Sequence, residues 1–321
     1  MIRPPKPHLR IRPKSKRLSS RHAVTVCIGA ICSEESEPRI VLCRDWRGEV
    51  PEVGITDAVI KRRHLSKEWV ALLAGNTARA EELCIRYESY LKTHILTEAN
   101  LTQEIRQVFH DYKKELVSSY LQSSYGISFD YLVNSGKDKF GEQFVATCLD
   151  TISRFRVDAE LIIAGFALVT DHLDGTTSKH PMLCALSEND DGDVAISEED
   201  FAVIGAGCNA ARTMLFYREQ DSGDGLMDTI YKVVEAKVMS RGVPGVGESL
   251  SLEVLYPNSP MLSLSSSGYD RCVELFRRFG PRNIYAKSAK KWFEFKPEYL
   301  EPLVESSPEP SPPSPDPTEK P

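Results

Sequence analysis

The stretch TVCIGAICSEESEPRIVLCRDWR, residues 25–47, contains two short apolar runs separated by polar residues. Val24–Cys32 and Arg39–Cys43 have the length and composition of β-strands, and Ser33–Pro38 between them has the composition of a turn. The stretch therefore predicts a β-hairpin near the start of the folded part of the chain.

Two further short apolar segments, Ala58–His64 and Trp69–Ala74, are also predicted strands. Along these four segments fall a hydroxyl, a carboxylate, an amine and a glycine turn, at Thr25, Asp45, Lys61 and Gly75. A hydroxyl group is a weak nucleophile and needs neighbouring groups of this kind to activate it. If Thr25 is the mature N-terminus, its own α-amine can act as the base.

The apolar pattern becomes helical after Gly75. Asn76 or Thr77 can cap a helix to about His94, and apolar residues recur at helical spacing through 105–120. Ser123–Arg156 fits either an extension of that helix or a loop insertion. Later segments predict strands at Leu161–Val169, Met182–Ser187, Val194–Ser197, Phe201–Ile204 and Ser249–Tyr256, and helices at Cys208–Glu219 and Leu226–Arg241.

The order of these elements is β-hairpins, helix pair, β-run, helix pair and final strand. Such blocks favour an α+β fold with two sheets stacked between two helix layers, because each sheet face needs a cover. A doubly wound parallel sheet would alternate strand and helix one by one.

Charge is distributed unevenly along the 321 residues. Residues 1–24 hold eight Lys or Arg and no acid, so removing them takes the formal net charge from −6 to −14. The net negative charge of residues 25–321 argues against nucleic-acid binding, for which a basic face is expected. No apolar run reaches the length of a membrane span, and the basic leader lacks the apolar core of a secretory signal.

The eight cysteines form no C-x-x-C pair, so they indicate neither a zinc site nor a redox dithiol. A chain of this length does not need a disulfide framework to fold. The cysteine pattern therefore predicts a reducing, cytoplasmic location, with no metal and no cofactor.

The spacing of the polar residues is similar to that of one known family. The chain resembles the proteasome β-type family of N-terminal-nucleophile (Ntn) hydrolases in four places, namely Thr25-Val26-Cys27-Ile28-Gly29, Asp45-Trp46-Arg47, Lys61 and Ala74-Gly75. The intervals from Asp45 to Lys61 and from Lys61 to Gly75 match the family without a gap. Ile162–Gly165 and Phe201–Gly207 also resemble family segments.

The resemblance implies a four-layer αββα Ntn-hydrolase sandwich over residues 25–256. Residues 1–24 are then a basic, Pro-rich leader, 257–305 a C-terminal appendage and 306–321 a disordered Pro/Ser-rich tail. Two routes would free Thr25. One is autolysis after Val24, and the other is translation that starts at Val24, followed by removal of that first residue.

The resemblance also implies a threonine-type endopeptidase. Thr25 Oγ attacks a peptide carbonyl and its proton passes to the free α-amine, while Lys61, held by Asp45, eases the deprotonation of Oγ. The Gly75 N–H faces the developing oxyanion, a contact typically worth about 3 kcal/mol.

Further expectations come from the same resemblance. Arg47 is a structural arginine, and the pocket for the residue before the cut bond is formed by Val59, Arg63 and Leu73. The partners are a peptide or unfolded protein substrate, further copies of the chain in a ring-shaped homo-oligomer, and an ATP-dependent unfoldase. No nucleic acid and no membrane is expected among them.

Alternative interpretations remain open. The supporting serine, acid and serine of the family fall at Ala206, Val243 and Val246. These departures favour a catalytically silent, proteasome-like structural subunit, and a small-amide Ntn hydrolase is a third possibility. Gly205-x-Gly207-x-x-Ala210 mimics a dinucleotide fingerprint, and Cys27 shares a strand face with Thr25 as a rival nucleophile.

Overall fold

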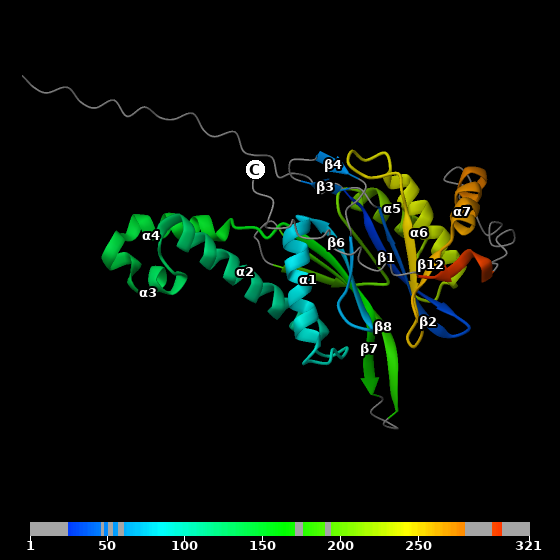
Figure 1. The fold of residues 1–321 in the computed structure, drawn as a ribbon, viewed down its shortest axis with the longest axis horizontal. Helices are drawn as coiled ribbons and strands as arrows, with labels where there is room; N and C mark the ends of the chain where they lie inside the picture. The colour runs from blue at the N-terminus through cyan, green and yellow to red at the C-terminus, as the bar shows by residue number, and fades with distance from the viewer. Residues whose placement is uncertain are drawn as a thin grey trace, which may run out of the picture.

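The computed structural model describes residues 25–45, 48–50, 54–56, 61–170, 176–189, 194–279 and 297–303. They form two large antiparallel sheets, a two-stranded ribbon and seven α-helices (Figure 1). The predicted α+β class is confirmed by this mixture of antiparallel sheets and helices. The predicted leader and Pro/Ser-rich tail lie outside the described residues.

The first large sheet, here the N-terminal sheet, has the strand order β10-β1-β2-β11-β12-β13, with every neighbouring pair antiparallel. Its strands are β1 (Cys27–Glu34), β2 (Glu37–Arg44), β10 (Phe201–Ile204), β11 (Ser251–Leu255), β12 (Leu262–Leu264) and β13 (Leu300–Pro302). The predicted hairpin of β1 and β2 is confirmed.

The turn of that hairpin is shorter than predicted. Only Glu35 and Ser36 lie between the strands, at φ 51° and 69°, the left-handed geometry of the two-residue turns that join twisted strands. The polar residues on either side continue the ladder, since Ser33 pairs with Pro38 and Glu34 with Glu37. Polarity alone therefore marked too long a turn.

The second large sheet, here the central sheet, has the order β5-β6-β7-β8-β9 and is also antiparallel. Its strands are β5 (Arg62–His64), β6 (Trp69–Gly75), β7 (Ala159–Thr170), β8 (Thr177–Glu188) and β9 (Val194–Glu198). The separate ribbon pairs β3 (Gly48–Val50) with β4 (Gly54–Thr56). The first part of the predicted strand Ala58–His64 falls outside the described residues.

Three buried clusters define the layers, because side chains on successive strand residues point to opposite faces. In β1, Cys27 and Ile31 face the central sheet, whereas Ile28 and Ala30 face helices α5 (Cys208–Tyr217) and α6 (Leu226–Ser240). The central sheet is covered on its other face by α1 (Thr77–Leu91) and α2 (Leu101–Tyr125). Figure 1 shows the two sheets between these helix pairs.

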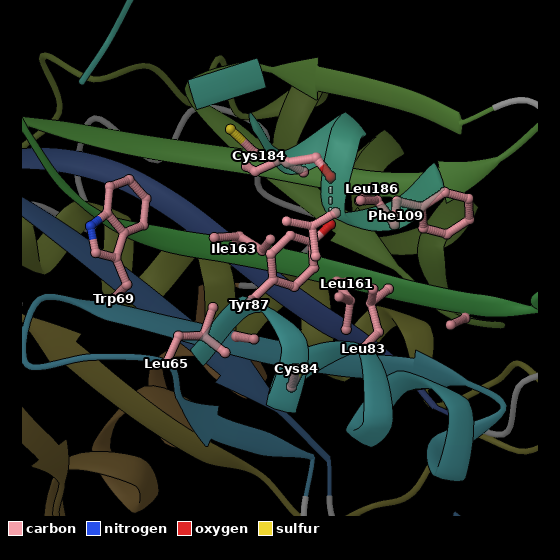
Figure 2. Close-up of a cluster of buried hydrophobic side chains, with 14 of the residues drawn as sticks. Leu65, Trp69, Leu83, Cys84, Tyr87, Phe109, Leu161, Ile163, Cys184 and Leu186 are labelled. Atoms are coloured by element: carbon pink, nitrogen blue, oxygen red, sulfur yellow. Dashed lines mark hydrogen bonds between the residues drawn. The ribbon is translucent and has the colours of Figure 1, made fainter. Parts of the chain in front are cut away.

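The predicted start of α1 is confirmed. Asn76 is its N-cap, and its side-chain oxygen accepts a hydrogen bond from the Arg79 N–H at 3.3 Å, which satisfies one of the exposed donors of the first turn. Figure 2 shows Leu83 and Tyr87 of α1 lying against the β7 side chains, among them Leu161.

Residues 123–156, ambiguous in sequence, are mostly helical. Helix α2 continues to Tyr125, and α3 (Phe129–Phe140) and α4 (Glu142–Ser153) follow. These helices project from the body in Figure 1 and have a small core of their own, formed by Val117, Leu121, Ile127, Leu132, Val145 and Cys148.

The C-terminal segment packs back on the same body. Strands β12 and β13 extend the N-terminal sheet beyond β11. Helix α7 (Ser266–Phe279) contacts α6, and the 3-10 helix η2 (Pro297–Tyr299) leads into β13. In the described residues, this part of the predicted appendage is therefore continuous with the sheet that holds β1.

Candidate active site

The hairpin register brings Thr25 beside Asp45. Cys27, the first residue of β1, pairs with Arg44, the last of β2, so the residues just outside the ladder lie next to each other. The Asp45 N–H donates to the Val26 carbonyl at 3.3 Å. The Thr25 hydroxyl donates to Asp45 Oδ1 at 2.6 Å.

Lys61 reaches the same place from the opposite sheet. Its carbonyl accepts a hydrogen bond from the Leu73 N–H of β6 at 3.0 Å, which anchors its backbone at the edge of the central sheet. Its Nζ donates to Thr25 Oγ1 at 2.5 Å and also to Asp45 Oδ1. The hydroxyl, the carboxylate and the amine predicted from sequence spacing are thus in mutual contact.

All three residues are buried. Thr25 is 2% exposed, Asp45 0% and Lys61 1%. Burial weakens solvent screening, so the Lys61–Asp45 attraction is stronger than that of a surface pair, and removing one member is costly. The ammonium group beside Oγ1 also favours the deprotonated form of the Thr25 hydroxyl.

The second oxygen of Asp45 is held by backbone donors. Oδ2 accepts from the Val26 N–H at 3.3 Å and from the Gly247 N–H at 2.9 Å. With Thr25 and Lys61 on Oδ1, four donors fix the orientation of the carboxylate. Sequence reasoning missed Gly247, because a main-chain donor leaves no side-chain signal.

Gly75 takes a conformation that requires glycine. Its φ is +78°, and a Cβ there would lie 2.2 Å from the carbonyl oxygen of Asp158. The Leu73 N–H points toward Lys61, and N–H groups two residues apart in a strand point to the same edge. The Gly75 N–H therefore points to the edge of β6 from which Lys61 extends to Thr25.

The glycine turn after β10 packs on the Thr25 backbone. Gly205 has φ +89°, and a Cβ there would lie 2.5 Å from the Thr25 carbonyl oxygen. The Gly207 N–H donates to that oxygen at 3.2 Å. The sheet that holds β10 is antiparallel throughout, and β11, the next strand along the chain, runs opposite to β10, so this turn does not belong to the parallel β-α-β unit that a dinucleotide fingerprint requires.

The predicted pocket residues in the described region share one face of the central sheet. Arg63 pairs with Ala71 of β6, and Ala71 and Leu73, two residues apart in that strand, point to the same face. The side chains of Arg63 and Leu73 therefore both point toward α1. Leu73 packs in the core under that helix. Arg63 pairs with Glu81 and Glu88 of α1, so two carboxylates already balance its charge. Two predicted residues lie outside the described part of the chain, Arg47 and Val59.

Cys27 is poorly suited to be a nucleophile. Its side chain is fully buried, and its thiol donates to the Leu73 carbonyl at 3.5 Å. Burial raises the pKa of this thiol to about 12, which suppresses the reactive thiolate.

A scan against protein-family models and a search of curated proteins give no match to this chain. Among the residues that the structure describes, no three His, Cys, Asp or Glu side chains gather as metal ligands, and no helix has both the length and the apolar character for crossing a bilayer.

Proposed function

We propose that the chain is a proteasome-like Ntn hydrolase of the threonine peptidase type, with Thr25 as the nucleophile once it is N-terminal. The observation that carries this proposal is the contact of Thr25 Oγ1 with both Lys61 Nζ and Asp45 Oδ1. The stacking of two antiparallel sheets between helix pairs supports the αββα Ntn sandwich as the finer fold assignment.

The reaction needs each of these groups. The α-amine of Thr25, with an ordinary pKa near ~8, takes the proton of Oγ, which attacks the peptide carbonyl. The tetrahedral oxyanion accepts a hydrogen bond from the Gly75 N–H, and its collapse expels the amine half of the substrate with that proton. Water then hydrolyses the ester on Thr25 and regenerates the hydroxyl. Lys61 Nζ, which donates to Oγ1, stabilises the negative charge that develops on that oxygen.

A second candidate is a catalytically silent subunit of the same fold. The observation that favours it is the burial of Thr25, which is 2% exposed in this structure. While an amide joins Val24 to Thr25, the chain also lacks the α-amine base. Val246, at a position where a polar group would support the site, packs instead in an apolar cluster.

Labelling of Thr25 separates these two candidates. The intact mass of the purified protein shows whether residues 1–24 have been removed, and an epoxyketone or β-lactone probe then tests the nucleophile. A peptidase with an N-terminal Thr25 reacts, and Thr25→Ala abolishes the reaction. Thr229→Ala, which alters another buried threonine on α6, leaves it unchanged. A processed protein that takes up no probe would refute the peptidase proposal.

Fluorogenic peptides test the substrate class. Turnover of internal peptide bonds supports an endopeptidase. Hydrolysis of small amides without turnover of peptides would instead favour a small-amide hydrolase.

A further inference from the structure

Lys237 on α6 is a fully buried lysine, with 0% exposure, among apolar neighbours such as Val233, Val234 and Ala236. Lysine is rarely buried to this extent without a partner of opposite charge. Among the described residues, the Lys237 side chain makes one hydrogen bond, in which Nζ donates to the Gly247 carbonyl at 2.5 Å.

The electrostatic surroundings make this burial unfavourable. Burial lowers the pKa of Lys237, and the positive charges of Arg241 and Lys61 act in the same direction, against the opposing effects of Cys43 and Asp45. A methionine would fill a similar volume without this desolvation cost. Packing alone therefore does not account for a lysine here.

The bond to Gly247 leads directly into the candidate active site. The Gly247 carbonyl accepts from Lys237, and the Gly247 N–H donates to Asp45 Oδ2 at 2.9 Å. Asp45 Oδ1 in turn accepts from Thr25 and Lys61. Lys237 is thus two hydrogen bonds from the carboxylate that holds the nucleophile.

The loop that makes this contact is held locally by the buried Val246 side chain and by two short-range backbone hydrogen bonds, Val243 N–H to Ser240 and Val246 N–H to Val243, neither of which fixes the Gly247 peptide. Residues 242–247 read GVPGVG and contain no charged side chain and three glycines, which lose the most conformational freedom on ordering. Lys237 holds the end of the loop through the Gly247 carbonyl, and Arg241 donates to the next carbonyl, that of Glu248, at 2.6 Å. Both anchors come from α6 or the residue that ends it.

We propose that Lys237 is a positioning residue of this site: by holding Gly247 it fixes the Asp45 carboxylate, and so the geometry of Thr25 and Lys61. The catalytic part of this inference rests on the proposed function, whereas the positioning of Gly247 does not. The hydrogen bond of Lys237 goes to Gly247 and not to Thr25, so Lys237 acts through Asp45 and not on substrate.

Three variants of the full chain test the proposal. Lys237→Met removes the hydrogen bond and the charge, and Lys237→Gln keeps a donor without the charge. Lys232→Met is the matched control, because Lys232 lies on the same helix and pairs with Asp224 instead.

Hydrogen exchange gives the first measurement, independent of activity. We expect the Gly247 amide to exchange at least about tenfold faster in Lys237→Met, less so in Lys237→Gln, and unchanged in Lys232→Met. Unchanged exchange at Gly247 in Lys237→Met would overturn the proposal.

The rate of probe labelling at Thr25 gives the second measurement. At saturating probe we expect the rate to fall by about 10- to 100-fold in Lys237→Met, with the half-saturating probe concentration unchanged, and to recover in part in Lys237→Gln. An equal rate in wild type and Lys237→Met, or no recovery with glutamine, would contradict the relay through Gly247. If the processed wild type takes up no probe, the proposed function fails, and the exchange result still decides whether Lys237 positions the loop.

Discussion

Replacing Asp45 with asparagine tests the central contact of the candidate site. The carboxylate is 0% exposed, and Asn has one acceptor oxygen where Asp has two. In one orientation the new NH₂ group faces the N–H donors of Val26 and Gly247, and in the other it faces the Lys61 ammonium. Either orientation opposes donor to donor, and both remove the negative charge beside Lys61.

The expected loss is large because the pair is buried. Breaking a buried ion pair by removing one partner typically costs about 3–5 kcal/mol. We therefore expect Asp45→Asn to lower the free energy of unfolding by about 3–5 kcal/mol, measured by urea denaturation at neutral pH. Asp150→Asn is the matched control, because Asp150 is 56% exposed in its pair with Arg154, and we expect it to change stability by less than about 1 kcal/mol.

A double-mutant cycle isolates the interaction. Lys61→Met removes the ammonium group, so the double variant with Asp45→Asn buries neither charge. We expect the double variant to lose about 1–3 kcal/mol less than the sum of the two single losses. A cost below about 1 kcal/mol for Asp45→Asn, or strictly additive losses, would refute the view of this contact as a coupled buried pair.

Three further predictions concern the backbone, a titrating group and the thiols. Gly75→Ala is expected to lower the free energy of unfolding, measured by thermal unfolding, by at least about 2 kcal/mol, because the new Cβ meets the backbone of Asp158. Gly126 also has a positive φ but lies in open space, so Gly126→Ala carries only the conformational strain. Equal losses in the two variants would contradict the steric argument. Lys237 has a lowered pKa, so between that value and the ordinary 10.5 the unfolded chain binds more protons, and the stability of wild type relative to Lys237→Met rises with pH by up to about 1.4 kcal/mol per pH unit. A pH-independent difference in urea midpoints would show that Lys237 titrates normally. Cys208, the one half-buried cysteine among eight, is expected to react first with a thiol reagent in the native protein, and mass mapping that found a buried cysteine labelled earlier would oppose this.

Much of the secondary structure could be predicted from local pattern. The short apolar runs of β1 and β2 and the capping signal at Asn76 involve neighbours in sequence, so composition and local pattern are enough to detect them. The two-residue turn at Glu35 and Ser36 could not be predicted in this way, because polar residues also occur at the solvent-exposed ends of strands. The helices of residues 123–156 were ambiguous because their small core forms only when they pack on one another.

The sequence by itself determined the order of the elements. It also determined the spacing of Thr25, Asp45 and Lys61, because each of these residues lies at or near one end of a short apolar segment. Only the tertiary structure decided that Lys61 crosses from one sheet to the other, because stacking of sheets has no signature in local periodicity. The roles of Gly247 and Lys237 likewise depend on a contact between Gly247 and Asp45, which are 202 residues apart in sequence, and the main chain of Gly247 makes that contact. Local physics therefore supplies the groups, and packing over long sequence separations supplies their geometry.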